Sequence, residues 1–434
     1  MTVQEKIKAK TITLQELYEK IPDGAIIGAS GIEFRAFYRD IHTIADRLTK
    51  PVVFHGGVGG GAEKYPYFWD DAYKDKFETW SGFYGATQRA NHDRGVVSHV
   101  PTHLHASSER WLDEYSYDVY LISGSPFDRH GCSWNGMGCP SYRGIEGAGL
   151  VVHVTNPNTP IVYGETELYI DMFDYIVEDT SPINTFEPGE LSDADRAIGE
   201  HVASLVEDGS TIQLGIGAIP DAVAAAFMSK KDLGIHTEMV TSAMADLVLA
   251  GVATGAKKTL HPYRLIGGFV SGSKKLVEFA TENPGVHLMP FKYVNNPWVI
   301  NKNYKMCSIN TCIEVDLTGQ VASETIGPRQ FSGTGGQNDT AEGAIHCPGG
   351  KSIIAFASAI TKKDGTRLSK IKSILTPGSV VTLSRNNIDY IVTENGIAPM
   401  KGRTVRQRVD NLIAIAHPDF REELRAEANQ FMLW

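Results

Sequence analysis

The sequence has no excess of basic charge. Its 51 acidic residues outnumber 41 basic ones, and the formal net charge is −10 at pH 7. Proteins that bind nucleic acid or an anionic membrane surface normally carry a basic patch. The charge therefore argues against nucleic acid and membrane as partners. A small anionic ligand held by backbone amides stays compatible with it.

Cysteine and long apolar runs are also scarce. The five cysteines are scattered without a CxxC pair, so neither a disulfide framework nor a thiolate zinc site is expected. The 14 histidines show no HExxH pattern, and we expect no metal. No run of 18 apolar residues occurs, and the N-terminus lacks the apolar segment of a signal peptide. These absences favour a cytoplasmic enzyme that acts on a small molecule.

Glycine, in contrast, is abundant, at 43 of 434 residues. Glycine permits tight turns and close approach of the backbone to a ligand. Three clusters stand out: five glycines within residues 56–61, the turn Gly215-Ile216-Gly217, and the run Ser332-Gly333-Thr334-Gly335-Gly336. Each is compatible with a ligand loop and with an ordinary turn or surface loop.

Short β-branched runs alternate with helical patterns along the whole chain. Helices are expected at 192–207, with a capping box from Ser192 to Asp195, and at 221–228. This alternation predicts an α/β fold with largely parallel sheets. The strands are expected at residues 25–27, 52–54, 119–122, 151–154, 212–214, 353–356 and 388–392.

Two segments repeat one order of elements. Residues 14–31 and 198–217 both show a helix, an Asp-Gly turn, a strand and a glycine-rich turn, at an offset of about 185. The strand at 119–122 with Asp128-x-x-Gly131 is matched to 313–315 with Asp316-x-x-Gly319. We therefore expect two similar α/β domains, at 1–185 and 186–434, although chance agreement of Asp-Gly turns is the alternative.

Two places carry candidate chemistry. The segment from Gln213 to Gly217 ends a strand and opens a helix, where backbone N–H groups can hold a phosphate or an oxyanion. Glu238 follows soon after it among apolar neighbours, which would raise the pKa of a buried carboxyl. Glu394, at another strand end, is a second candidate carboxylate.

Several separated motifs resemble those of the family I CoA-transferases, in the acetyl-CoA hydrolase/transferase group. The chain is most similar to the 4-hydroxybutyrate and butyryl-CoA:acetate transferases of that group. The motifs are IQLGIGAIPDAV, LGIHTEM, GQVASETIG, SGTGGQND, VTENGIAPMKGR and IAHPDFREEL over residues 196–425, with SPFDRHGCSWNG and PIVYGET before them.

The resemblance implies two Rossmann-like domains with the active site between them. It makes Glu238 the nucleophile, with Thr237 where the family has serine. It also implies transfer of CoA between short-chain acids such as 4-hydroxybutyrate, butyrate or acetate, by ping-pong kinetics through a glutamyl-CoA thioester. Coenzyme A is then a substrate, with no tightly bound cofactor. A homodimer or homotetramer is expected.

The remaining roles follow from the same resemblance. Gly336 would supply an oxyanion amide, Asn295 would lie near the nucleophile, and Glu394 would support the substrate carboxylate. The residues expected to contact CoA are Gln213, Leu214, Gly215, Ile216, Gly217, Ser332, Gly335, Gly336 and Lys362.

Two departures from the family pattern leave the acyl substrate open. Ser242-Ala243 stands where the family has Asp-Gly, and Asn395 stands where it has tyrosine. An acyl-CoA hydrolase on the same scaffold is therefore an alternative, because hydrolysis results wherever water reaches the intermediates. A non-catalytic nucleotide-binding module is another. A nicotinamide dehydrogenase is disfavoured by the missing third glycine of the dinucleotide fingerprint.

Overall fold

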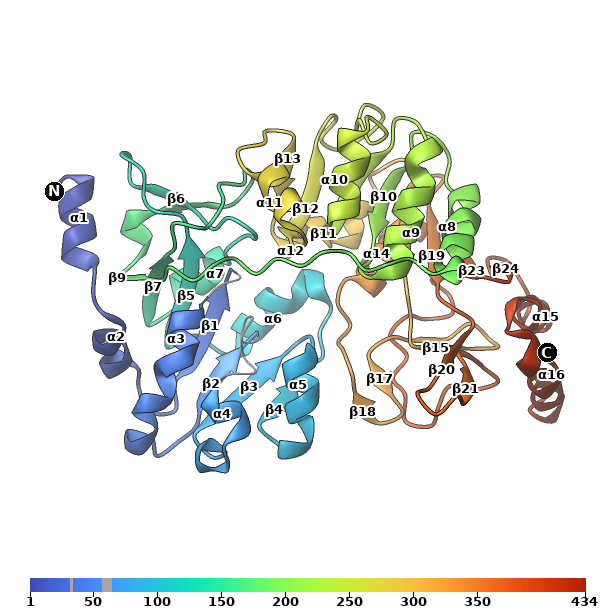
Figure 1. The fold of residues 1–434 in the computed structure, drawn as a ribbon, viewed down its shortest axis with the longest axis horizontal. Helices are drawn as coiled ribbons and strands as arrows, with labels where there is room; N and C mark the ends of the chain where they lie inside the picture. Colours follow the sequence, from blue (N-terminus) through green and yellow to red (C-terminus); the bar gives the residue numbers. More distant parts are fainter. Residues whose placement is uncertain (32–33, 57–64) are drawn as a thin grey trace. The chain divides into compact units, whose positions relative to one another are not determined.

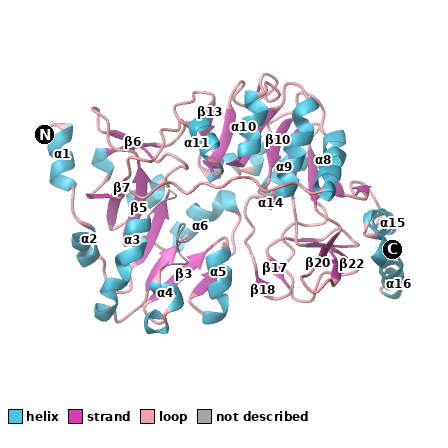
Figure 2. Cartoon of the chain, in the orientation of Figure 1, coloured by secondary structure: helices cyan, strands magenta, loops and turns pink. Residues whose placement is uncertain are grey.

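A computed structural model describes residues 1–31, 34–56 and 65–434. By its internal contacts the chain divides into two units, Met1–Phe186 with Gly268–Phe291, and Glu187–Gly267 with Lys292–Trp434. Each unit contains helices and a mostly parallel sheet (Figures 1 and 2). The predicted α/β class with two domains is confirmed. Of the first glycine cluster, residues 57–61 lie outside the described part of the chain.

The first sheet has the strand order β4-β3-β2-β1-β5-β7-β9, and all six pairs of neighbouring strands are parallel. Its strands are β1 Ile26–Ser30, β2 Val52–His55, β3 Phe77–Ser81, β4 Val97–His99, β5 Val119–Gly124, β7 Leu150–Thr155 and β9 Tyr175–Glu178. The helices of this part are α1 Val3–Lys10, α2 Leu14–Lys20, α3 Arg35–Asp40, α4 Pro66–Trp69, α5 Ala86–Asn91, α6 Ser107–Glu114 and α7 Tyr142–Gly147.

The second sheet has the order β13-β12-β11-β10-β14-β19-β23-β24, and its edge strand β24 runs antiparallel to β23. Its strands are β10 Thr211–Leu214, β11 Gly234–Val240, β12 Leu265–Val270, β13 Val286–Leu288, β14 Met306–Asn310, β19 Lys351–Ala355, β23 Tyr390–Thr393 and β24 Gly396–Pro399. The helices from residue 193 onward are α8 Asp193–Leu205, α9 Ala218–Ala226, α10 Ser242–Leu249, α11 Lys274–Ala280, α12 Phe291–Val294, α13 Pro297–Ile300, α14 Gln337–Ile345, α15 Val405–Ile415 and α16 Arg421–Gln430.

Small antiparallel or mixed sheets complete the fold. They pair β6 Cys132–Trp134 with β8 Glu167–Tyr169, β17 Thr325–Ile326 with β18 Arg329–Gln330, β20 Ala359–Thr361 with β21 Arg367–Ser369, and β15 Glu314–Asp316 with both β16 Val321–Ala322 and β22 Ile371–Lys372.

The two parallel sheets repeat one topology. In the first sheet β1 lies between β2 and β5, and in the second sheet β10 lies between β11 and β14. The strands β1, β2 and β5 therefore correspond to β10, β11 and β14. The registers agree as well. Ile26 pairs with Val53 as Thr211 pairs with Gly234, and Ile27 pairs with Val119 as Ile212 pairs with Cys307. The internal duplication inferred from the sequence therefore extends to the level of individual strand pairs.

One strand match made from the sequence is wrong. The counterpart of the strand at 119–122 is β14, Met306–Asn310, and not residues 313–315, whose last two residues start the short β15. The following turns do correspond: Asp128 Oδ1 accepts from the N–H groups of His130 and Cys132, and Asp316 Oδ1 accepts from those of Thr318 and Gln320. The turn was matched correctly, but the apolar run beside it was mistaken for the strand.

The domain limits differ from the expected ones in one segment. The change from the first to the second unit after Phe186 lies close to the expected boundary at 185. The segment Gly268–Phe291, however, is grouped with the first unit, where the N–H of Leu288 donates to Tyr163 O over 2.8 Å and that of Val270 donates to Met137 O over 2.9 Å. Hydrogen bonds of this kind between distant segments leave no trace in local sequence patterns.

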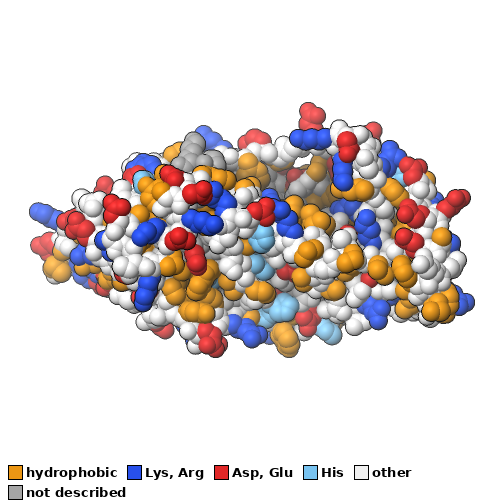
Figure 3. Space-filling view, turned by 90° about the horizontal axis from the view of Figure 1, so that it is seen from below, with side chains coloured by type: hydrophobic (Ala, Val, Ile, Leu, Met, Phe, Trp, Pro, Cys, Tyr) orange, Lys and Arg blue, Asp and Glu red, His pale blue; other side chains and the backbone are white. Residues whose placement is uncertain are grey.

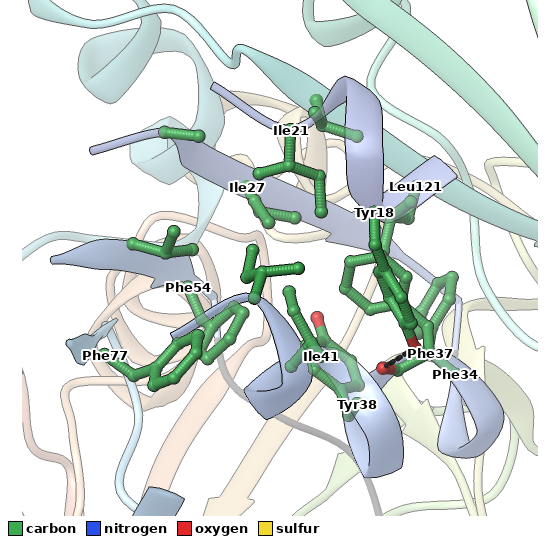
Figure 4. Close-up of a cluster of buried hydrophobic side chains, with 14 of the residues drawn as sticks. Tyr18, Ile21, Ile27, Phe34, Phe37, Tyr38, Ile41, Phe54, Phe77 and Leu121 are labelled. Atoms are coloured by element: carbon green, nitrogen blue, oxygen red, sulfur yellow. Dashed lines mark hydrogen bonds between the residues drawn. The ribbon is translucent and has the colours of Figure 1, made fainter. Parts of the chain in front are cut away.

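Helix caps and apolar faces account for the local structure. The helix α8 begins after the predicted capping box, in which Ser192 and Asp195 bond each other's backbone, and buries Ile198 and Val202. In the first unit, aromatic side chains such as Tyr38, Phe54 and Phe77 fill the core between α2, α3 and the sheet (Figure 4). These cores fix the strands whose ends carry the polar residues described below.

Acidic and basic side chains are interspersed over the face drawn in Figure 3. Among the described residues, no helix combines the length and apolar character that a membrane crossing needs.

Candidate active site

Glu238 lies near the carboxyl end of β11 and is half-buried. The side-chain amide of Asn295 donates to its Oε2 over 3.1 Å. The backbone N–H of Gly336 donates to the same carboxylate. The structure therefore brings together the three residues that the sequence motifs placed at the reaction centre, although they lie on widely separated parts of the chain.

Gly336 owes its identity to this contact. It is the N-cap residue of α14, with φ at −94°, so its backbone conformation alone does not require glycine. A β-carbon there would overlap both Glu238 Oε2 and the amide nitrogen of Asn295. The residue is glycine because the carboxylate occupies the space that a side chain would fill.

The environment of Glu238 raises its pKa to about 7. Burial has the largest effect, and the negative charge of Asp339 acts in the same direction, while the hydrogen bonds from Asn295 and Gly336 oppose both. Asp339 lies in the first turn of α14 and is fully buried. A carboxyl group poised near neutral pH, facing two hydrogen-bond donors, is suited to nucleophilic or acid–base chemistry.

A buried polar network supports the helix that carries Gly336. Ser308 Oγ on β14 lies 3.1 Å from Gln213 Oε1 and 2.9 Å from Thr340 Oγ1, within hydrogen-bond distance of both, and Asn310 Nδ2 donates to the same two oxygens. The network ties the ends of β10 and β14 to α14. The sequence reasoning did not find Ser308, Asn310 or Thr340, because nothing in local spacing connects these three positions.

This network also assigns a structural partner to Gln213. Its amide donates to Asn310 Oδ1 over 3.1 Å, and the side chain is buried. Leu214 is buried beside it on β10, and the N–H of Gly215 donates to Ile309 O over 2.9 Å. The expected contacts of these residues with CoA stay predictions.

The end of the same turn is open. Ile216 exposes 54% of its surface. Gly217 adopts φ of +107° at the N-cap of α9, a conformation that favours glycine, and a β-carbon there would meet no atom within 4 Å. This glycine is thus explained by the turn itself.

The second glycine loop approaches Glu238 only at its end. Gly335, at φ of +53°, directly precedes Gly336. Ser332 is farther back, and its N–H donates to Glu324 O over 2.9 Å. Whether Ser332 and Gly335 contact CoA stays a prediction.

Glu394 and Lys362 lie on other elements than Glu238. Glu394 follows β23, which lies four strands from β11 in the sheet, or about 19 Å at the usual strand spacing. Its carboxylate accepts hydrogen bonds from the N–H of Ser358, over 2.8 Å, and from the Ser358 hydroxyl. Lys362 lies at the exposed tip of the β20–β21 hairpin, where its N–H donates to Thr366 O. The roles expected for Glu394 at the substrate carboxylate and for Lys362 at CoA stay predictions.

In the described part of the chain, no group of three or more His, Cys, Asp or Glu side chains is placed to hold a metal ion.

Comparison with known proteins agrees with these features. Residues 1–187 match the acetyl-CoA hydrolase/transferase N-terminal domain, and residues 272–428 match the C-terminal domain of the same name. The chain is 48% identical to the 4-hydroxybutyrate coenzyme A transferase of Clostridium kluyveri over 71% of this chain and 72% of that protein. It is 35% identical to a probable butyrate:acetyl-CoA coenzyme A-transferase of Syntrophomonas wolfei, over 99% and 97%.

A solved structure gives the same result for the fold. The 4-hydroxybutyrate CoA-transferase of Porphyromonas gingivalis superposes with a TM-score of 0.80 at 33% identity, over 99% of both chains. The family expected from the sequence motifs is confirmed, as is the class of enzyme. The chain belongs to the acetyl-CoA hydrolase/transferase family and is a CoA-transferase.

Proposed function

We propose that this enzyme transfers coenzyme A from an acyl-CoA to a free short-chain carboxylic acid, with Glu238 as the nucleophile. The observation that carries the proposal is the environment of Glu238. Its carboxylate is half-buried, has a pKa of about 7, and faces two donors from Asn295 and Gly336. Glu314, a buried carboxylate in a structural role, is bound instead by three donors. They are the N–H and the hydroxyl of Thr376 and the hydroxyl of Ser379.

The first half-reaction forms and breaks bonds at two carbonyl carbons. A Glu238 oxygen attacks the thioester carbonyl, the C–S bond breaks, and CoA leaves as a thiolate. An acyl-glutamyl anhydride remains on the enzyme. The thiolate attacks the glutamyl carbonyl and releases the first carboxylate. A glutamyl-CoA thioester remains on the enzyme. A second carboxylate then reverses these steps, so that a new acyl-CoA leaves and the Glu238 carboxylate is restored without net proton transfer.

Each step passes through a tetrahedral oxyanion, which the two donors at Glu238 are placed to stabilise. In the free enzyme these donors bind the carboxylate itself. When one carboxylate oxygen is acylated, or the carboxyl carbon is bound to sulfur, the same N–H groups face the remaining oxygen, on which negative charge develops. Removal of one such donor raises a barrier by about 3–4 kcal/mol in other acyl-transfer enzymes.

The acid pair is inferred from the relatives. Those named above are described as acting on 4-hydroxybutyrate, or on butyrate and acetyl-CoA. We propose the same range of short-chain acids here. Ser242 and Ala243, which depart from the family motif, begin α10 directly after β11 and are the positions where a different preference would arise.

The covalent intermediate provides the direct test. The enzyme is incubated with butyryl-CoA, reduced with borohydride, digested and examined by mass spectrometry. The peptide containing Glu238 should show the reduced side chain, while the peptide containing Glu314 should be unchanged. Modification elsewhere, or full transfer activity in Glu238→Gln, would refute the role of Glu238. CoA release without an acceptor acid at the same rate as with one would instead identify a hydrolase.

The CoA-contacting residues, the cytoplasmic location and the homo-oligomeric state belong to the same proposal. If the Lys362→Ala variant keeps the wild-type KM for acyl-CoA, Lys362 does not belong to the proposed CoA-binding residues.

A further inference from the structure

A second hydrogen bond, besides the one between Asn295 and Glu238, connects the strand of Glu238 to the turn of Asn295. His236 lies two residues before Glu238 on β11, so the two side chains project from the same face of the strand. The imidazole is buried, and its Nε2 lies 2.9 Å from the backbone oxygen of Val294. Val294 is the last residue of α12 and directly precedes Asn295. His236 thus bonds the peptide group from which the Asn295 side chain extends.

These contacts close a ring. It runs from Glu238 along β11 to His236, through a hydrogen bond to Val294, along one peptide bond to Asn295, and back through the 3.1 Å hydrogen bond to Glu238 Oε2. The amide of Asn295 is therefore held relative to the carboxylate by a short path that begins and ends on the same strand.

The tautomer of His236 follows from its partner. A carbonyl oxygen only accepts, so Nε2 must carry the proton. Burial, with a smaller contribution from the positive charge of Lys258, lowers the pKa of His236 to about 3, so the ring is neutral at physiological pH. Its Nδ1 is buried without a hydrogen-bond partner among the described residues. The side chain is thus a fixed donor and not a proton-transfer group.

Neighbouring residues anchor both segments that the hydrogen bond between His236 and Val294 joins. The buried Lys258 donates to Ile235 O over 2.8 Å and to Arg264 O over 2.6 Å, which fixes β11 next to His236. His261 bonds the hydroxyl of Tyr293, over 2.7 Å, which fixes α12 next to Val294. The His236–Val294 bond thus joins two segments that are each anchored independently.

We propose that His236 is a positioning residue for catalysis, which holds the Val294–Asn295 peptide so that the Asn295 amide meets Glu238 and the oxyanions formed on it. This inference rests on the proposed role of Glu238. It assigns to His236 a function separate from substrate binding. Displacement of a positioned group by about 1 Å is sufficient to lower a rate by about 100-fold.

A double-mutant cycle tests the proposal. His236→Met removes the donor at similar volume, and Asn295→Ala removes the amide. We expect His236→Met to lower kcat about 10-fold to 100-fold while the KM for acyl-CoA changes less than about 3-fold. In the Asn295→Ala background the same substitution should lower kcat by less than about 2-fold, because the group that it positions is absent. The proposal would be overturned if the losses of kcat from the two substitutions multiply in the double variant. Wild-type kcat in His236→Met would also overturn it.

Conservative variants separate positioning from general structure. Glutamine can place an amide N–H near the site of Nε2, whereas asparagine places it closer to Nδ1. His236→Gln should therefore retain most of the activity and His236→Asn should lose it, and equal activities would contradict the proposal even if His236→Met does not fold. His42, which bonds Arg39 O over 3.0 Å in the first unit, provides the matched control, and His42→Met should keep the wild-type kcat.

The Glu238→Gln variant distinguishes failure of this inference from failure of the proposed function. Full transfer by Glu238→Gln removes the nucleophile that the inference requires. If Glu238→Gln is inactive, the role of Glu238 as nucleophile stands. If the losses of kcat from the His236 and Asn295 substitutions then multiply in the double variant, only the positioning role of His236 is refuted.

Discussion

The side-chain amide of Asn295 donates to Oε2 of Glu238 over 3.1 Å, although 57 residues separate the two in sequence. Asn295 ends the turn after α12, and Glu238 lies on a central strand, so the contact depends on the packing of that turn against β11. We infer that catalysis depends on the same packing.

Removal of the Asn295 amide should impair the chemical step. We expect Asn295→Ala to lower kcat about 100-fold to 1,000-fold, the usual effect of losing one oxyanion donor. Steady-state transfer from butyryl-CoA to acetate measures this. Asn296 is the matched control, because its amide bonds Lys292 O and its oxygen caps α13. Asn296→Ala should keep kcat within about 3-fold, and comparable losses in both variants would show a structural effect only.

The rate should rise with pH through the pKa of Glu238. Only the ionised carboxylate attacks the thioester, so kcat/KM for acyl-CoA should increase to a plateau with an apparent pKa near 7. The hydrogen bond from Asn295 lowers that pKa, so in Asn295→Ala the profile should move to higher pH. A flat profile between pH 5 and 9 in the wild-type enzyme would contradict the assignment.

Glu238 should also make stability depend on pH. Because its folded-state pKa is raised from 4.5 to about 7, the folded protein holds a proton that the unfolded chain releases between these values. The stabilisation is present below pH 4.5 and is lost as pH rises through 7, by at most about 3 kcal/mol. Glu238→Gln should therefore be more stable than the wild type at pH 8 and similar to it at pH 4.5.

Urea unfolding of the two proteins, followed at both pH values, measures this difference. A variant that is less stable than the wild type at pH 8 would show that the carboxylate is stabilised by its partners more than burial destabilises it.

A side chain at position 336 should displace the nucleophile. In Gly336→Ala the added methyl group overlaps the ends of Glu238 and Asn295, both flexible side chains, so the fold should persist while kcat falls at least about 100-fold. Gly147 ends α7 in open space, and Gly147→Ala should leave activity unchanged. Circular dichroism with transfer assays separates loss of fold from loss of chemistry. Wild-type activity in Gly336→Ala would show that Glu238 does not need its position next to the helix terminus.

The sequence alone predicted the parts of this site that lie within single segments. The apolar neighbours of Glu238 predicted that its carboxylate is partly buried, and the capping box at Ser192 predicted the start of α8. The strand β11 itself was not among the expected strands. Asn295 and Gly336 were placed only through the resemblance to a family, because their contacts to Glu238 join distant segments. The network of Ser308, Asn310 and Thr340 was not predicted, since it exists only after β14 and α14 have packed together.

Strand order and register account for what the sequence could not place. The role expected for Glu394 at the substrate carboxylate stays a prediction, and strand order separates its strand β23 from β11 by three intervening strands. Residues 313–315 were matched to β5, although the equivalent strand ends at Asn310. Strand order and register are tertiary properties, and an apolar run does not reveal them.

The matched registers of the two sheets have a consequence for stoichiometry. Pairing of Ile26 with Val53 and of Thr211 with Gly234 makes His55 the counterpart of His236. Counted two residues further along the sequence, the counterpart of Glu238 is a glycine, residue 57. The repeat thus preserves the histidine and lacks the carboxylate. Titration with acyl-CoA in the absence of an acceptor should accordingly saturate at one equivalent of covalently bound CoA per chain, despite the duplicated scaffold.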